Sequence, residues 1–166
     1  MAKALLIKRD DVMTFSNVNG NIDTDKMIQY IAIAQDMHLQ RYLGTDLLEK
    51  LQADVVADTL SGNYLTLVQD WVKPALIHWT MVELIPMTAV TIGNGGIYRH
   101  SSENSTALSS VEISELVSQE RDFATYYSKR LVDYLCNNSE LFPEYSSNSN
   151  EDVDPSTDTN FCGWVL

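Results

Sequence analysis

The side chains of this 166-residue sequence that could do chemistry are its three histidines, its two cysteines and its many acidic residues. His38, His78 and His100 fall in three different predicted elements, and no HExxH, CxxC or nucleophile-elbow pattern accompanies them. His78 and Glu83 could form an acid–base pair, but five residues on a helix separate them by about 140°, so they do not share a face. We therefore expect no catalytic residue, and we expect Glu83 to meet a lysine or arginine of a neighbouring helix or subunit.

The segment 16–25 is dense in side-chain oxygens and could suggest a calcium loop. Gly20 would occupy the sixth position of that loop, which places Phe15 at the first position and Lys26 at the twelfth, where a bidentate glutamate is required. We therefore predict an Asn-Gly turn and a helix cap at Asp23. No metal ligand set is expected here or elsewhere.

Glycines at 93, 95 and 96 resemble a phosphate-binding loop only in composition. They follow a predicted helix rather than a strand, and no lysine stands beside them, so no cofactor-binding residue is expected. Cys136 and Cys162 have no metal-ligand spacing, which argues against a disulfide framework and a zinc site.

The charge balance is strongly acidic, with 23 Asp and Glu against 11 Lys and Arg, a net charge of −12. Such a surface repels nucleic-acid phosphates, which argues against a sequence-reading DNA binder. An acidic protein can still lie beside DNA without gripping it. The first residues lack the apolar core of a signal peptide, and we expect the protein to be made in a reducing cytoplasm.

The elements that must position these side chains are organised around residues 74–92, which would be apolar on every side of a helix. A membrane span needs about 20 mostly apolar residues, and this stretch is interrupted by His78, Glu83 and Pro86. We therefore expect no membrane segment. Residues 74–92 are interpreted as the central helix of a helical domain, with Pro86 bending it or ending it early.

The predicted fold is mainly α, a bundle of about five helices around this central helix, with a short N-terminal strand at 4–7. Amphipathic helices are expected over 24–43, 46–58, 64–73 and 110–137. Gly44 and Thr45 should end the first of these helices and cap the second. Pro74 either begins the central helix or kinks a longer one. The expected buried face of the last helix consists of Ile113, Leu116, Glu120, Phe123, Tyr127, Leu131 and Tyr134.

Residues 93–110 form a connection that is too long and too polar for an ordinary link between helices. A hairpin with 97–99 as one arm and 106–108 as the other fits this composition, and so does a surface loop.

The composition changes again after the helical domain 1–145, and residues 146–166 form an extended acidic tail. Residues 146–160 are rich in Ser, Asn, Asp and Glu and cannot bury enough apolar surface to offset their ordering entropy. The chain then reads FCGWVL. Apolar residues on a polar tether are typical of a docking peptide, although they could also fold back on their own domain.

The order of features along residues 3–145 resembles that of small head–tail connector proteins, the neck or adaptor rings of tailed bacteriophages. The likeness is strongest to those of phages that infect Bacteroidetes, crAss-like phages included. The acidic tail and the FCGWVL end match nothing in that pattern. The motifs that carry the resemblance are NGNID at 19–23, AQ at 34–35, LGT at 43–45, LLEKL at 47–51, GG at 95–96, YSKRLVDYL at 127–135 and FPEY at 142–145.

This resemblance implies a non-enzymatic structural virion protein, a ring usually of twelve copies between the portal and the tail. Its partners would be the portal and other neck or tail proteins, and DNA would pass through its channel without specific binding. It would lie in the neck of the virion and in the host cytoplasm during assembly. The candidate subunit and partner interface consists of Ile97, Tyr98, Arg99, Leu108, Phe161, Trp164, Val165 and Leu166.

Two functions of other classes fit the same sequence. One is a cytosolic helical adaptor that binds a protein partner through its Trp164 end. The other is an enzyme whose active site is dispersed along the chain.

Overall fold

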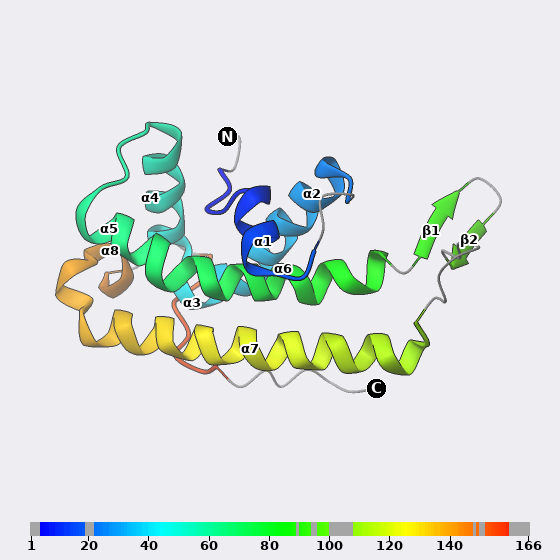
Figure 1. Ribbon diagram of the computed structural model, residues 1–166. Helices are drawn as coiled ribbons and strands as arrows, with labels where there is room; N and C mark the ends of the chain where they lie inside the picture. Colours follow the sequence, from blue (N-terminus) through cyan, green and yellow to red (C-terminus); the bar gives the residue numbers. More distant parts are fainter. Residues whose placement is uncertain are drawn as a thin grey trace.

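The computed structural model describes residues 4–18, 22–88, 90–93, 96–99, 108–147, 149 and 152–159, and this part of the chain is mainly helical, as predicted. Figure 1 shows α6 and α7 as two long helices side by side, with a small hairpin beyond one end of the pair. The elements are α1 (Arg9–Phe15), α2 (Thr24–Ala34), α3 (Gln40–Leu43), α4 (Thr45–Val56), α5 (Gly62–Thr66), α6 (Lys73–Thr88), β1 (Val90–Gly93), β2 (Gly96–Arg99), α7 (Ser110–Asn137) and α8 (Pro143–Ser146), with a 3₁₀ turn at Ser139–Leu141.

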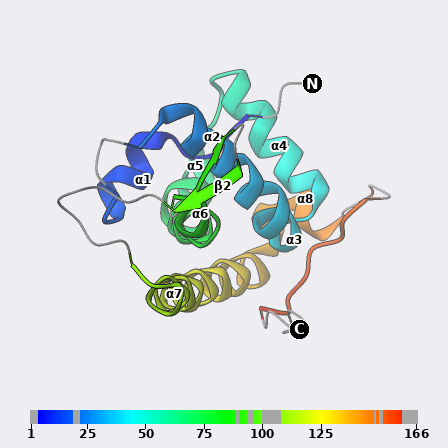
Figure 2. The same cartoon turned by 90° about the vertical axis from the view of Figure 1, so that its right-hand side faces the viewer.

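The apolar helix α6 lies in the middle of the molecule. It packs against α1 and α2 on one side and against α7 on the other, and the end-on view of Figure 2 shows it between these layers. Its buried residues face every direction around the helix, because neighbours surround it as the all-round apolar sequence predicts. They are Ala75, Leu76, Ile77, Trp79, Thr80, Met81, Val82 and Leu84. No helix in the described part of the chain is long and apolar enough to cross a membrane.

Two continuous helices each contain a wider, π-helical turn. The helix predicted over 24–43 is formed, with α2 and α3 joined by the π turn Gln35–Leu39. The second π turn, Leu67–Val72, joins α5 to α6 and directly precedes Pro74. In a regular α-helix the proline ring would press on the carbonyl of Asp70, and the wider turn changes that geometry. Pro74 therefore lies inside a continuous helix.

Helix α7 has the predicted bounds and begins with a Ser109–Glu112 capping box, but its buried face agrees with the prediction only in part. Leu116 and Phe123 are exposed, whereas Ala124 and Ser128 are fully buried. Small residues at this crossing let α6 approach closely, since long side chains would hold the two helices apart. The buried residues of α7 are Ala124, Ser128, Leu131, Val132 and Leu135. Leu131 is therefore buried as predicted, whereas Leu116 and Phe123 are not.

The strand predicted at 4–7 is not formed, and a side-chain amide forms hydrogen bonds with the backbone of these residues instead. Leu6 N–H donates to Gln35 Oε1 at 3.0 Å, and Gln35 Nε2 donates to the Ala4 carbonyl at 3.0 Å. Gln52 Nε2 also donates to the Ala4 carbonyl, at 3.2 Å. The buried Gln35 amide thus takes the place of a neighbouring strand, which the helical fold does not supply.

The predicted central helix ends at Thr88, four residues earlier than expected, and the chain continues as a hairpin. Strand β1 pairs antiparallel with β2, with Val90 opposite Arg99 and Gly93 opposite Gly96. A hairpin was one of the two structures considered for 93–110, with 97–99 paired to 106–108. In the structure 97–99 pairs instead with 90–92, which were assigned to the central helix. Residues 100–107, which include most of the other predicted arm, lie outside the described residues.

Candidate interaction site

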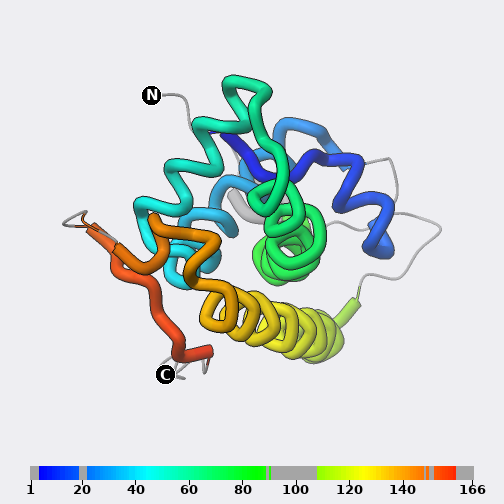
Figure 3. The backbone as a smooth tube through the Cα atoms, turned by 90° about the vertical axis from the view of Figure 1, so that its left-hand side faces the viewer, coloured from blue at the N-terminus to red at the C-terminus, as the bar shows by residue number. Residues whose placement is uncertain are grey.

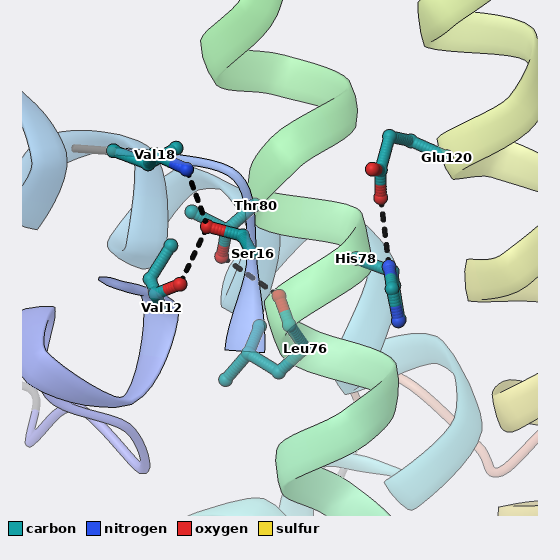
Figure 4. A network of polar contacts seen from close by, with 7 residues as sticks. All are labelled: Val12, Ser16, Val18, Leu76, His78, Thr80 and Glu120. Carbon is teal, nitrogen blue, oxygen red and sulfur yellow. Dashed lines mark hydrogen bonds and ion pairs between the residues drawn. The ribbon is translucent and has the colours of Figure 1, made fainter. Parts of the chain in front are cut away.

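Two histidine–glutamate pairs flank α6, and sequence spacing pointed to neither of them. His38 Nε2 lies 2.8 Å from Glu83 Oε1, and His78 Nδ1 lies 2.7 Å from Glu120 Oε2 (Figure 4). His78 and Glu83 do not share a face, as predicted. Within the chain Glu83 meets His38 of the helix 24–43, and not the lysine or arginine predicted for a neighbouring helix. Each pair joins two separate helices, so no motif along the chain could have indicated it.

The His38–Glu83 pair is built into the core. The His38 side chain is only 6% exposed, and its ring stacks on that of Trp79 with centroids 3.9 Å apart and planes 7° apart. General acid–base chemistry needs a substrate within hydrogen-bond reach, and this ring is covered. The pair therefore fastens the helix 24–43 to α6. In the described residues, no three His, Cys, Asp or Glu side chains are placed to hold a metal ion.

The second pair borders a pocket of about 440 Å³ between α1, α6 and α7. Half of its lining residues are apolar or aromatic, namely Pro74, Ile77, Phe15 and Tyr127. Volumes of this size are typical of sites that hold a small ligand or an anchoring side chain. The complete lining is Phe15, Gln69, Asp70, Lys73, Pro74, Ile77, His78 and Tyr127.

Exposed aromatic side chains gather around this pocket. Phe15 is 65% exposed and Tyr126 is 59% exposed, and Phe123 is exposed as well. The His78 ring stacks on Tyr127 at 5.3 Å and meets Phe123 at the same distance, and Tyr126 stands edge-on to Tyr127. Aromatic residues are enriched in protein interfaces and in their hot spots. We call Phe15, Phe123, Tyr126 and Tyr127 the aromatic patch. Phe123 and Tyr127 had been assigned from the sequence to the buried face of the last helix.

An ion pair fixes α1 beside the pocket. Lys73 Nζ donates to Asp11 Oδ1 at 2.8 Å, and Lys8 N–H donates to Asp11 Oδ2 at 2.8 Å. Burial alone would raise the pKa of Asp11, but these hydrogen bonds and the two lysine charges outweigh it and lower the pKa below its usual value. The Asp11 carboxylate therefore holds α1 against α6 in its ionised form.

Replacing Asp11 with asparagine should lower the free energy of unfolding by about 1 kcal/mol at pH 7. Because the folded pKa of Asp11 is lowered, its contribution is present above the unfolded pKa of about 3.9 and is lost as pH falls through the folded pKa. Urea unfolding at pH 7 and at pH 2 should therefore show a difference between wild type and Asp11→Asn that disappears in acid. The exposed neighbour Asp10 supplies the control, since Asp10→Asn should change stability little at either pH. Equal effects of the two variants would contradict this role for Asp11.

The interface residues predicted around 97–108 lie at the hairpin end of the molecule (Figure 1). Ile97, Tyr98 and Arg99 belong to β2, and Leu108 precedes α7 with its side chain exposed. Val111, in the first turn of α7, is 64% exposed. A shallow hollow of about 310 Å³ runs along this turn, lined by Leu108, Glu112, Glu115, Leu116 and Gln119.

The other predicted interface residues, Phe161, Trp164, Val165 and Leu166, lie outside the described residues. The chain before them was expected to be a loose polar tether, but residues 152–159 lie against α3 and α4. Thr45 N–H donates to the Val153 carbonyl at 3.0 Å, and Val153 N–H donates to Thr45 Oγ1 at 3.1 Å. Thr45 was predicted to cap α4; instead Gly44 precedes the helix and the Thr45 hydroxyl binds the tail.

Three further contacts hold the tail segment. Ser156 N–H donates to the Arg41 carbonyl at 2.8 Å, and the Arg41 side chain lies 3.8 Å from Asp158. Gln40 Nε2 donates to Asp152 Oδ2 at 3.0 Å. Backbone groups make much of this docking, so the polar composition of the segment did not indicate it. We call residues 152–159 the strap.

Figures 2 and 3 view the molecule from opposite ends, and both show the strap and α1 on opposite sides of α6. The pocket and Phe15 belong to the α1 side. The strap therefore lies across α6 from α1, the helix that carries Phe15.

Comparison with known proteins gives one match. Residues 39–155 match a family described as a family of unknown function, DUF6712. The matched region begins in the helix that receives the strap and ends within the strap, at Pro155. No curated protein and no solved structure matches the chain.

Proposed function

The chain belongs to the DUF6712 family, a family of unknown function, and we propose that it is a structural virion protein that forms a ring between the portal and the tail of a bacteriophage. Its role is that of a head–tail connector, and it is not an enzyme. In this proposal the subunit is a helical bundle around α6, the ring has twelve copies, and the portal and other neck or tail proteins are its partners. It resides in the virion neck and passes through the host cytoplasm during assembly.

The observation that carries the proposal is the exposed apolar surface along the first half of α7 and its hairpin end. Leu108, Val111 and Leu116 are all exposed, and Phe123 and Tyr126 of the aromatic patch are exposed further along the same helix. Exposed large apolar side chains gathered on one element are typical of protein–protein contact sites. Neighbouring subunits of a ring would cover such a surface on each copy.

The charge of the chain supports the same role. A net charge of −12 makes the channel of an assembled ring repel the phosphate backbone of DNA. DNA then passes without specific binding. A protein that gripped DNA would carry the opposite sign of charge along its binding surface.

Co-expression with the portal protein of the same phage tests the proposal. Wild-type protein should co-purify as a portal-bound ring, with twelve copies by native mass measurement. Val111→Asp, which places a charge in the apolar surface of α7, should lower the bound fraction at least tenfold, equivalent to about 1.4 kcal/mol. Val56→Asp is the control, because Val56 is 71% exposed on α4, away from α7.

A wild-type protein that fails to co-assemble with the portal would contradict the connector role. Equal loss of binding in Val56→Asp and Val111→Asp would contradict the assignment of the α7 surface to the subunit contact.

A further inference from the structure

We infer that the pocket inside the aromatic patch receives the apolar segment 161–166 of a neighbouring copy of this chain, with Trp164 as its anchor. This inference rests on the proposed function, because it names the contact that would join one subunit of the ring to the next. Its three parts are the pocket, the segment and the geometry that directs one to the other.

The pocket has the chemistry of a site for an aromatic anchor. Its lining includes the apolar residues Pro74 and Ile77 and the aromatic rings of Phe15 and Tyr127. Aromatic rings pair edge-on or offset with a gain of about 0.5–1.5 kcal/mol beyond the area they bury. The exposed carboxylate of Asp70 lines the same pocket and can accept a hydrogen bond from an indole N–H.

The segment 161–166 has the complementary chemistry. It reads FCGWVL and carries no charged side chain, in a chain of net charge −12. Between two copies of so acidic a protein, an uncharged apolar peptide avoids the repulsion that most other surface segments would meet. Tryptophan is among the residues that most often contribute a hot spot.

The geometry directs the segment to another copy. The strap fixes the chain on the α3 side through Thr45, Arg41 and Val153, and the pocket lies on the α1 side, across α6 (Figures 2 and 3). Residues 160–166 can span at most about 25 Å when fully extended. One face of each subunit thus donates a segment and the opposite face accepts one. A contact between two different faces is heterologous, and its repetition gives a ring when the rotation from copy to copy closes.

Disulfide cross-linking between two marked chains tests this contact. Both chains carry Cys136→Ser, because Cys136 is exposed and would compete. The acceptor chain also carries Cys162→Ser and Gln69→Cys at the pocket, and the donor chain keeps Cys162. The two full-length chains are mixed and oxidised, with and without the portal. The control acceptor carries Val56→Cys in place of Gln69→Cys, at an exposed site on α4.

The Gln69→Cys acceptor should give at least ten times more covalent dimer than the Val56→Cys acceptor. Phe15→Ala in the acceptor should lower that yield about tenfold, since truncation of a hot spot costs more than 1 kcal/mol. Phe15 is exposed, so the fold remains intact. Equal dimer yields from the two acceptors, or no dimer in either condition, would overturn the inference.

A single chain that carries both Gln69→Cys and Cys162 distinguishes the two directions of docking. An internally linked monomer as its only product would show the segment in its own pocket and would overturn the contact between copies. Selective dimer formation without portal co-assembly would retain this contact and contradict the connector role. Portal co-assembly without the dimer would support the connector role and contradict this contact between copies.

Discussion

Replacing Trp79 with alanine should lower the free energy of unfolding by about 3–5 kcal/mol, the largest loss we expect from a single substitution in this chain. Trp79 is almost fully buried, stacks on His38 and donates from Nε1 to Ser128 Oγ at 2.9 Å. Alanine would leave a cavity where α6 meets both α7 and the helix 24–43. It would also remove the ring that covers the His38–Glu83 pair. Urea unfolding followed by far-ultraviolet circular dichroism measures the loss.

Two further variants separate the contributions of Trp79. Trp79→Phe keeps an aromatic ring but removes the hydrogen bond from Trp79 Nε1 to Ser128, which should cost about 1 kcal/mol because the Ser128 hydroxyl keeps its hydrogen bond with Tyr42. Trp71→Ala removes a tryptophan that stacks on Tyr134 at 4.5 Å but is only partly buried, so it should cost less than Trp79→Ala. A loss below 1 kcal/mol for Trp79→Ala would contradict the central place given to this residue.

Replacing Gly44 with alanine should detach the strap and destabilise the turn between α3 and α4. Gly44 has φ 75° and ψ 165°, a conformation that is essentially limited to glycine and costs other residues about 1–3 kcal/mol. A Cβ atom at this position would also lie 2.7 Å from Pro155 Cγ. The alanine side chain and the docked strap cannot both be accommodated. Proteolysis after acidic residues, which the strap has at Asp152, Asp154 and Asp158, should become at least tenfold faster.

Gly62→Ala is the matched control for Gly44→Ala. Gly62 also has a positive φ, of 57°, but a Cβ atom there would meet nothing within 4 Å. It should therefore lower stability through backbone strain without faster cleavage of the strap. Pro155→Ala in the Gly44→Ala background should restore part of the lost protection, because it removes the atom nearest to the new Cβ. Unchanged cleavage of Gly44→Ala would contradict the close packing of this glycine against the strap.

Local sequence signals predicted the helices well. Asp23 marks the start of the helix Thr24–Leu43, and Gly44 follows its end. Ser109 marks the start of Ser110–Asn137, whose last residue is an asparagine. The central position of α6 follows from an apolar sequence that leaves no polar face. Each of these signals resides within the helix that it marks or within a few residues of its ends.

The α7 face and the hairpin were predicted less well. Periodicity placed Leu116 and Phe123 inward, although α6 packs on a face that contains Ala124 and Ser128. The aromatic patch was therefore missed as a surface feature. Residues 90–92 looked helical because they are apolar, but β1 pairs there with β2. Pairing with a strand further along the chain decided this segment, and apolar composition does not distinguish the two structures.

By itself, the sequence determined that this protein is mainly helical, strongly acidic and built around one apolar helix. Only the tertiary structure decided which side chains meet: His38 with Glu83, His78 with Glu120, and the strap with the turn at Gly44. The physical reason is that helix formation depends on contacts three or four residues apart, whereas these pairs join residues 42 or more positions apart. The pocket beside the aromatic patch exists only because α1, α6 and α7 come together.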